Sequence, residues 1–583
     1  MTASAPASDT PHTPALRMPG HLFDELAAGG GSERAVAFLR RGERTRRLLL
    51  LRELLDGLDA LPRPALGPAG GTAPVWSVLE TAARHAPAAV DGLLMSPQCG
   101  AWIAHMLRRL HGSASGPPLW ADAAHLACLA ATASLLAGTD ADLTAPVRAG
   151  GLTLPTLGLL QLGPRDRAFD TVRVSVRAGA VTAGAVRVRP LDAPGTRPDV
   201  PGWLPLRTLR PSGAVLDDLD PYRDLDEPVP PARLPAEEFA HWEKTLDEAH
   251  ALLARTPDPD AVGTLRPGDI TRLVPWLTEE GSGVRLSAST GDAFGSMMVS
   301  RPDDATDLAE TLVHEFQHSK LGALLHLFPL LADDRAERFY APWRADPRHL
   351  PGLLHGAYAF TGVAGFWRAR MAERTGGPGS AAAFHFALRR LQTRLVVRTL
   401  ATRADLTPAG RRLVAGLAAT LDRWLREPVD PAVAARARAA AVSHRVEWRL
   451  RNLRCGPAER AALARARADG APPPRGPAPE PVPGGSAAHW EDTRAAGYLT
   501  PRPGPGADAR LTSGDPVRAR DLYAARLRRA PGDAHALSGL LLAHSLLDPR
   551  ARRLLARPER VAAALDVVDG DAAEAVRWLA GTG

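Results

Sequence analysis

The sequence predicts a mainly α-helical protein with a small β-rich segment. Apolar residues recur at three- and four-residue spacing through much of the chain, as in RAVAFLRRGERTRRLLLLRELLDGL (34–58), which is typical of amphipathic helices. From about 150 to 215 the period changes, and TVRVSVRAGAVTAGAVRVRPL alternates Val with Arg, Ser or Thr. This alternation, with its break at Ala178–Gly179, predicts a β-hairpin.

The composition indicates a folded chain and disfavours nucleic acid as a partner. Of its 583 residues 45% are hydrophobic and 23% charged, which is enough to bury a core. The net charge of +7 comes almost entirely from arginines, but these are scattered among alanines, leucines and acidic residues. A nucleic-acid surface would gather them with aromatic residues into a stripe.

Cysteine usage and the apolar runs predict a cytoplasmic protein without a membrane partner. Cys99, Cys128 and Cys455 are far apart and form neither a CxxC pair nor a disulfide framework, which favours a reducing compartment. The N-terminal segment lacks the apolar core of a signal peptide. The longest apolar run, around 125–138, is too short to span a bilayer and predicts a buried helix.

Changes of composition and period divide the chain into expected regions. An acidic run at 216–231, LDDLDPYRDLDEPVPP, lacks the Gly and the terminal Glu of a calcium loop and is interpreted as a turn. The expected regions are a disordered N-terminus (1–20), a helical region (21–149), a β-rich segment (150–232), a helical catalytic domain (233–470), a Pro/Gly-rich linker (471–513) and a C-terminal helical, tetratricopeptide-like subdomain (514–583).

The segment TLVHEFQHSK (311–320) carries the clearest chemical signal. His314 and His318 are four residues apart, so on a helix from about 304 to 326, capped by Asp303 or Asp304, both imidazoles reach one ion. Glu315 lies between them and is the candidate catalytic residue. A catalytic ion needs a third protein ligand. The candidates are Glu337, Asp346, His349 and His355.

Among these candidates His355 is favoured as the third ligand. It lies in PGLLHGAYAF, near the start of an apolar helix expected at 352–373, next to the small residues Gly356 and Ala357. Glu337 lies in ADDRAERF, a charged run more typical of a solvated surface. Asp346 stays open as an alternative, and it would complete a set of two histidines and one carboxylate.

Two cations near the motif suit a small anionic co-substrate. Arg344 follows a Trp in the Pro-bounded segment YAPWRADPRHL, where it can hold a carboxylate through two hydrogen bonds. Lys320 follows His318 by two residues. A zinc peptidase needs no such clamp, whereas a 2-oxo acid that chelates iron has a distal carboxylate to be neutralised. The alternative for Arg344 is an ordinary surface salt bridge.

Taken together, these segments resemble those of the actinobacterial HExxH-domain peptide-modifying proteins. The similar segments are LVHEFQHSKLGALLHL, YAPWRADPRHLPGLLHGAYAFTGVAGFW, DLDPYRD and FGSMMVSRP, within residues 215–375. The resemblance implies an iron(II)- and 2-oxoglutarate-dependent dioxygenase that hydroxylates a β-carbon in a ribosomally made precursor peptide. It also implies a mostly helical fold that is not a cupin barrel.

The resemblance also implies roles for individual residues and partners. His314, His318 and His355 would bind iron, and Arg344 and Lys320 would contact 2-oxoglutarate. Glu315 would orient a ligand or a water. The chain has no cysteine cluster for an iron–sulfur centre and so resembles the stand-alone form of the family. The expected partners are the precursor peptide and a separately encoded radical SAM enzyme.

Two further hypotheses stay open. A zinc metallopeptidase would use Glu315 as its general base, with Glu337 or His355 as the third ligand. A non-catalytic helical protein would only bind a peptide, and replacing His314 with Ala would leave its function intact. Metal identity and dependence on 2-oxoglutarate distinguish these hypotheses. The β-rich segment at 150–215 offers edges that could add a peptide strand.

Overall fold

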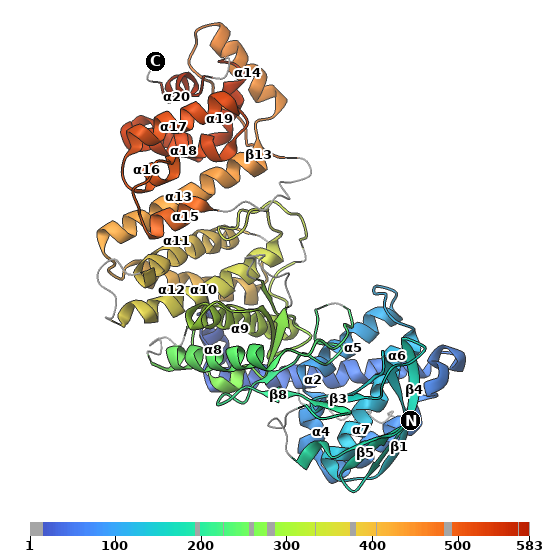
Figure 1. The fold of residues 1–583 in the computed structure, drawn as a ribbon. Helices are drawn as coiled ribbons and strands as arrows, with labels where there is room; N and C mark the ends of the chain where they lie inside the picture. Colours follow the sequence, from blue (N-terminus) through green and yellow to red (C-terminus); the bar gives the residue numbers. More distant parts are fainter. Residues whose placement is uncertain are drawn as a thin grey trace, which may run out of the picture.

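The computed structural model confirms a mainly helical chain with added β-sheet (Figure 1). It describes residues 16–581 except 193–198, 226, 256–261, 277–285, 333, 374–380, 404, 483–491 and 569–570. Most of the segment predicted to be disordered, 1–20, therefore lies outside the described residues. The molecule is elongated: a sheet-containing N-terminal part and a stack of C-terminal helices form its two ends, with the HExxH helix between them.

The N-terminal end is built from helices packed against a large sheet. Helix α7 packs on α3 and on the first strand, β1, and its side chains are buried almost throughout. The stretch Leu119–Ala137 is long and apolar enough to cross a membrane, but 83% of that window is buried inside the fold. The helices of this part are α2 (Glu33–Asp59), α3 (Thr72–His85), α4 (Pro87–Leu94), α5 (Pro97–Leu110), α6 (Leu119–Ala123) and α7 (His125–Ala137).

The large sheet contains the predicted hairpin and begins earlier than predicted. Its order is β6-β5-β4-β1-β2-β3-β7. The hairpin turns at Ala178 (φ 47°) and Gly179 (φ 75°), where the sequence pattern breaks. The first strand lies inside the region predicted to be helical, because its eight residues pair with β4, a partner far along the chain. The strands are β1 (Ala141–Arg148), β2 (Gly151–Leu154), β3 (Gly158–Gln161), β4 (Phe169–Arg177), β5 (Ala180–Ala183), β6 (Val186–Val188) and β7 (Trp203–Pro205).

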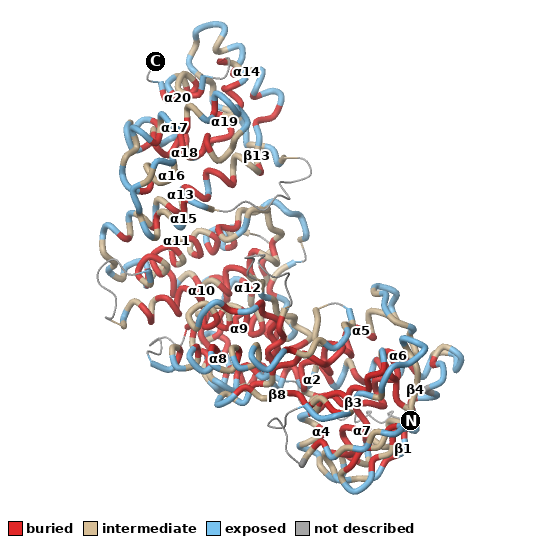
Figure 2. Tube along the Cα trace, viewed as in Figure 1, coloured by how far each residue is buried: buried red, intermediate tan, exposed pale blue. Residues whose placement is uncertain are grey.

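A central hydrophobic core surrounds the HExxH helix, α9. It joins α1 and the first half of α2 to α8–α12 and a small sheet, whereas the second half of α2 enters the N-terminal core. Figure 2 shows this buried centre around α9 and α10. The helices are α1 (Gly20–Ala27), α8 (Ala236–Arg255), α9 (Ala305–Leu327), α10 (Leu350–Ala372), α11 (Ala381–Ala401) and α12 (Pro408–Leu425).

The small sheet leads directly into α9. Its order is β11-β12-β10-β9-β8, with β12 parallel to β10 and β11 antiparallel to β12 at one edge. Asp304 then caps α9, accepting hydrogen bonds from the backbone N–H groups of Thr306 and Asp307, so one of the two predicted caps is confirmed. The strands are β8 (Arg207–Thr208), β9 (Val215–Leu216), β10 (Arg272–Trp276), β11 (Ser287–Ala288) and β12 (Ser296–Ser300).

The C-terminal helices pack on α13, which also reaches the central part. The predicted linker 471–513 contains helices α15 and α16, because Arg494 and Tyr498 bury their side chains against the fold. The elements are α13 (Pro431–Asn452), β13 (Leu453–Arg454), α14 (Pro457–Ala468), β14 (Glu480–Pro481), α15 (Thr493–Leu499), α16 (Ala507–Thr512), α17 (Pro516–Arg529), α18 (Ala534–Leu547), α19 (Pro558–Leu565) and α20 (Ala572–Ala580).

Candidate metal centre

His314 and His318 face each other on one side of α9. Their Nε2 atoms are 3.1 Å apart and their ring centroids 4.7 Å apart. One helical turn separates residues four apart, so the spacing alone brings the rings to the same face. Two imidazole nitrogens that share a metal at about 2.1 Å each would lie at a similar separation. The pair therefore fits two ligands of one ion.

His355 reaches the same cluster from α10, but from the other side of His318. Its Nδ1 lies 3.4 Å from the Nδ1 of His318, whereas His314 faces the Nε2 of that ring. Within the described part of the chain no group of three His, Cys, Asp or Glu side chains is arranged to hold one ion. His355 is thus adjacent to the pair, and its ring must turn before it becomes the third ligand.

Burial keeps the three imidazoles neutral. It lowers the pKa of His314 well below its ordinary value, and the neighbouring His318 and Arg389 add to this effect. Burial likewise lowers the pKa of His318 to about 4 and, with help from His318 and nearby cations, that of His355 to about 3. Neutral imidazoles retain the lone pairs that metal ions require.

Glu315 is held by two serines of β11 and the residue that follows it. The hydroxyl of Ser287 donates to one carboxylate oxygen and that of Ser289 to the other, each over 2.7 Å. The side chain is buried, with 2% of the residue exposed. Burial raises its pKa, and the two serine hydrogen bonds oppose this shift. Both oxygens of the carboxylate are therefore already engaged by the protein.

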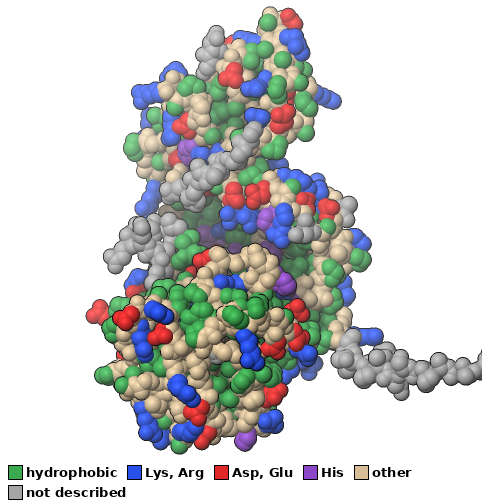
Figure 3. Space-filling view, turned by 90° about the vertical axis from the view of Figure 1, so that its right-hand side faces the viewer, with side chains coloured by type: hydrophobic (Ala, Val, Ile, Leu, Met, Phe, Trp, Pro, Cys, Tyr) green, Lys and Arg blue, Asp and Glu red, His purple; other side chains and the backbone are tan. Residues whose placement is uncertain are grey.

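The histidines border a cavity of about 630 Å³ whose wall is rich in arginine. Arg335, Arg344 and Arg348 line it, as does His349. Figure 3 shows arginine and histidine side chains gathered around a hollow near the middle of the visible face. A concave site with convergent charged groups is the usual form of a small-molecule site. The charge of this wall suits an anion.

Tight packing places the arginine segment beside His355. The indole of Trp343 lies 2.3 Å from where a Cβ on Gly356 would be, so only glycine allows this approach. The Arg344 guanidinium donates to Asp346 over 2.8 Å, and Arg348 lies 3.7 Å from the same carboxylate. Although burial opposes the shift, the pKa of Asp346 is lowered by its hydrogen bond to Arg344.

Lys320 lies outside this cavity, unlike the other predicted site residues. The remaining residues, His314, Glu315, His318, Arg344 and His355, all line it. The Lys320 ammonium is buried beneath α9, where it donates to the carbonyl oxygens of Gly30 (2.7 Å) and Gly29 (3.4 Å). Burial lowers its pKa to about 7. The structure therefore gives Lys320 a role in anchoring the N-terminal segment instead of a contact with a co-substrate.

The other candidates for third ligand are less well placed. Asp346 pairs with two arginines, and it is not among the residues described as lining the cavity. Glu337 is exposed and is not among those lining residues either. His349 does line the cavity, but its Nδ1 caps α10 by accepting from the N–H of Gly352 over 3.0 Å. His355 remains the best placed.

Sequence reasoning missed Ser287, Ser289, Arg335 and Arg348 as residues of this site. The alternation in LSAST predicts a short strand but not its partner, since contact with Glu315 depends on packing of the small sheet against α9. Arg348 lies in the same segment as Arg344, YAPWRADPRHL, and Arg335 lies in the charged run just before it, so the clustering of arginines along this stretch is the signal that could have found them.

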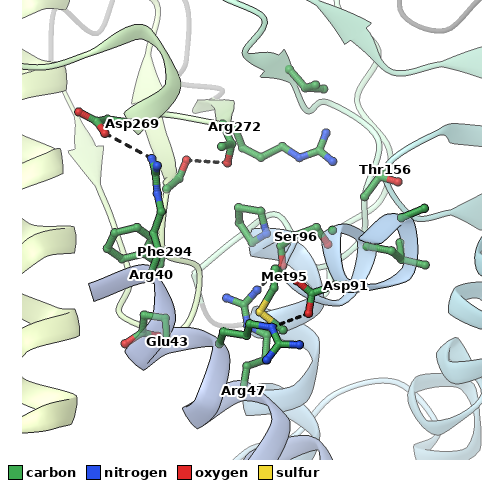
Figure 4. Close-up of a pocket in the computed structure, with 18 of the residues that line it drawn as sticks. Arg40, Glu43, Arg47, Asp91, Met95, Ser96, Thr156, Asp269, Arg272 and Phe294 are labelled. Atoms are coloured by element: carbon green, nitrogen blue, oxygen red, sulfur yellow. Dashed lines mark hydrogen bonds and ion pairs between the residues drawn. The ribbon is translucent and has the colours of Figure 1, made fainter. Parts of the chain in front are cut away.

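A second cavity, of about 690 Å³, lies between α2, α4 and the small sheet (Figure 4). Two of its arginines form ion pairs: Arg40 with Asp269 (3.3 Å) and Arg44 with Asp91 (2.6 Å). Arg47 donates to the backbone oxygen of Ser96. Among its described lining residues there is no histidine. The chemistry of a metal centre is therefore concentrated in the first cavity.

A scan against protein-family models finds no match to this sequence, and a search of curated proteins finds no similar sequence. The geometry and chemistry of the site itself therefore have to indicate the function.

Proposed function

We propose that the protein is an iron(II)- and 2-oxoglutarate-dependent dioxygenase. It hydroxylates a β-carbon in a ribosomally made precursor peptide, in the cytoplasm, alongside a radical SAM enzyme that modifies the same peptide. One observation carries the proposal: two histidine Nε2 atoms 3.1 Å apart border a cavity lined by Arg335, Arg344 and Arg348. Metal donors and anion donors thus meet in one cavity.

The donor set fits the metal in part. His314 and His318 would hold iron through Nε2, with His355 as the leading third ligand after reorientation of its ring. Neutral imidazoles suit iron, and three protein ligands would leave coordination positions for other groups. Iron at this site, with 2-oxoglutarate and oxygen, would supply an oxidant for C–H bonds, and 2-oxoglutarate would leave as succinate and carbon dioxide.

The chain's own residues then bind and orient the co-substrate. Arg344 is the leading contact for the distal carboxylate, with Arg348 beside it, because a guanidinium binds a carboxylate through two parallel hydrogen bonds. Asp346 holds both guanidinium groups in place until the co-substrate competes for them. Glu315, fixed by two serines, positions the HExxH turn and the water around it.

A zinc metallopeptidase is the second candidate, and one observation favours it. Glu315 lies in the cavity with the histidine pair, where a general base would have to be. Its two oxygens, however, accept hydrogen bonds from Ser287 and Ser289, and Glu337, an expected third ligand, is exposed. The arginine wall also has no role in that reaction. Binding without catalysis would leave the neutral histidine pair without a function.

Succinate formation tests the proposal without the true peptide, through uncoupled turnover. The protein is purified without oxygen, its metal is analysed, and it is incubated with Fe(II), 2-oxoglutarate and oxygen. We expect bound iron and succinate in the wild type, and loss of both in His314→Ala. The matched control is His326→Asn on the same helix, because His326 bonds to Glu43 outside the cavity. It should keep iron and succinate formation.

The opposite pattern would favour the peptidase. Tightly bound zinc, no succinate, and cleavage of a peptide library that disappears in Glu315→Ala would overturn the oxygenase proposal. Zinc together with succinate formation after exchange for iron would support it, since a site of neutral imidazoles binds either metal. Unchanged function in His314→Ala would instead indicate a protein that only binds its partner.

A further inference from the structure

Strand β11 forms an edge of the small sheet, and this edge borders the histidine cavity. Ser287 pairs with Val299 and Ala288 with Met298, both on β12, and the order of the sheet places no described strand on the other side of β11. Ser287, Ala288 and Ser289 all line the cavity that contains His314 and His318. An edge of a sheet is a template for another strand.

The backbone groups of this edge alternate in direction. The carbonyl of Leu286 accepts from the N–H of Ser300 over 2.8 Å, so Leu286 faces β12. In an antiparallel pair, successive residues alternate between facing the partner and facing away. Ala288 therefore faces β12, and the backbone N–H and C=O groups of Ser287 and Ser289 face outward. Among the described residues they have no backbone partner.

The serine side chains on this edge are directed toward Glu315 of the HExxH helix. The hydroxyls of Ser287 and Ser289 both reach Glu315, so these two residues present their side chains toward α9. Residues directly opposite each other in paired strands share a face of the sheet. A strand added to β11 would therefore direct every second side chain toward α9 and its histidines.

We propose that β11 binds the substrate as an extended peptide segment that pairs with the backbone of Ser287 and Ser289. The identity of that peptide as a precursor rests on the proposed function, whereas the binding mode does not. Pairing of backbones fixes the distance of the peptide from His314 and His318, and alternation selects which of its residues faces them.

The described surroundings favour an extended chain over a helix or a small ligand alone. Outward backbone groups offer hydrogen bonds that only another backbone in extended form satisfies in succession. The cavity of about 630 Å³ is large enough for a co-substrate at the arginine wall together with a side chain of the peptide. Strand addition at 150–215 stays a prediction, whereas β11 lies on a different sheet whose edge adjoins the histidines.

Binding of peptides tests this inference without turnover. Peptides are selected from a random ten-residue display library on the full-length protein, without co-substrate or oxygen. From these, only the peptides that protect the amides around His318 from hydrogen exchange are studied further. We expect the amides of Ser287 and Ser289 to become protected on binding. We also expect methylation of the peptide's amide nitrogens to weaken binding tenfold or more at every second residue only.

Proline on the protein side supplies the reciprocal test. Proline is tolerated on edge strands where the N–H faces outward, so Ser287→Pro with Ser289→Pro should fold and weaken peptide binding about tenfold or more. The matched variant, Ser287→Ala with Ser289→Ala, loses the same two hydroxyls to Glu315 but keeps both N–H groups. The proline variant should bind the peptide about tenfold or more weakly than this alanine variant. If the proline variant fails to fold, the methylation pattern on the wild type still decides.

Other results would overturn strand pairing. One is that methylation of the peptide weakens binding without a two-residue period. Another is that a folded proline variant binds the peptide as tightly as the wild type. A third is that the library yields no peptide that binds at this cavity. None of these results bears on succinate formation by the wild type. Conversely, a wild type could form no succinate and still bind peptides whose affinity falls on methylation at every second residue. That result would overturn the dioxygenase proposal and would still support strand pairing at β11.

Discussion

At the scale of single residues, the hydrogen bonds of Glu315 define its role. A general base contributes about a hundredfold to ten-thousandfold to a rate, and Glu315 has both oxygens engaged by Ser287 and Ser289. We expect Glu315→Gln to lower succinate formation about tenfold or less, since the amide retains one acceptor. Steady-state rates with Fe(II) and 2-oxoglutarate measure this. A loss beyond a hundredfold with iron still bound would contradict a positioning role.

Arg344 and Lys320, the two predicted contacts for 2-oxoglutarate, are expected to respond differently to substitution. Arg344→Met should raise the KM for 2-oxoglutarate about tenfold or more, because a charged hydrogen-bonded pair is lost. Lys320→Met should leave that KM unchanged. It should instead destabilise the fold by about 1–3 kcal/mol, because the carbonyl oxygens of Gly29 and Gly30 lose a buried donor. Co-substrate titration and urea unfolding distinguish the two effects, and a raised KM in Lys320→Met would restore it to the site.

Sequence alone predicts residues whose partners lie one helical turn away. The spacing of His314 and His318 is enough to bring their rings together on α9. It cannot predict that Ser287 reaches Glu315, because that contact depends on a sheet packing against a helix. Nor can it place Lys320, since two residues after His318 the helix faces the N-terminal segment instead of the cavity.

At the scale of elements, α18 is attached to α13 and α16 through a buried charge cluster. His535 at the start of α18 contacts Glu447 of α13 and Asp508 of α16, each over 3.0 Å. Arg494 of α15 lies in the same cluster and also pairs with Glu447. Burial and Arg494 oppose protonation of His535, but the carboxylates prevail and raise its pKa to about 9.

This raised pKa predicts a stability that falls at alkaline pH. Because the folded pKa of His535 is above the ordinary 6.5, its contribution is complete below about pH 6.5 and is lost as pH rises through about 9. We expect His535→Gln to cost about 1–2 kcal/mol at pH 6 and much less at pH 10. Thermal midpoints of both proteins at the two pH values measure this difference, and a constant difference would contradict it.

Elements with strong local patterns were predictable. The helix expected at 304–326 is Ala305–Leu327, and that expected at 352–373 is Leu350–Ala372, because both have continuous apolar faces and a cap or proline at the start. Strand β1 was not predictable, since seven of its eight residues pair in the sheet only with β4, more than twenty residues later. Helices α15 and α16 were hidden by a composition rich in proline and glycine.

At the scale of the whole molecule, the C-terminal end supports the arginine wall. The segment that carries Arg344 is bonded to α13 at two places: Asn452 donates to the carbonyl of Ala345 over 2.9 Å, and Tyr340 contacts His444 over 2.9 Å. On α13, Val446 packs in the C-terminal hydrophobic core, and Glu447 belongs to the buried charge cluster with His535. The C-terminal helices therefore hold α13 in place, and α13 in turn holds the segment that carries Arg344.

This arrangement predicts a long-range effect on co-substrate binding alone. Asn452→Ala removes the donor to Ala345, whose neighbour is Arg344, while α9 and its histidines stay untouched. Because small misplacements of a binding group are costly, we expect the KM for 2-oxoglutarate to rise about threefold to tenfold with iron affinity unchanged. Val442→Ala on the same helix, at an exposed position, is the matched control and should alter neither. Equal weakening of iron and co-substrate binding by Asn452→Ala would indicate general loosening instead, and α13 would then hold the metal helix as well as the arginine wall.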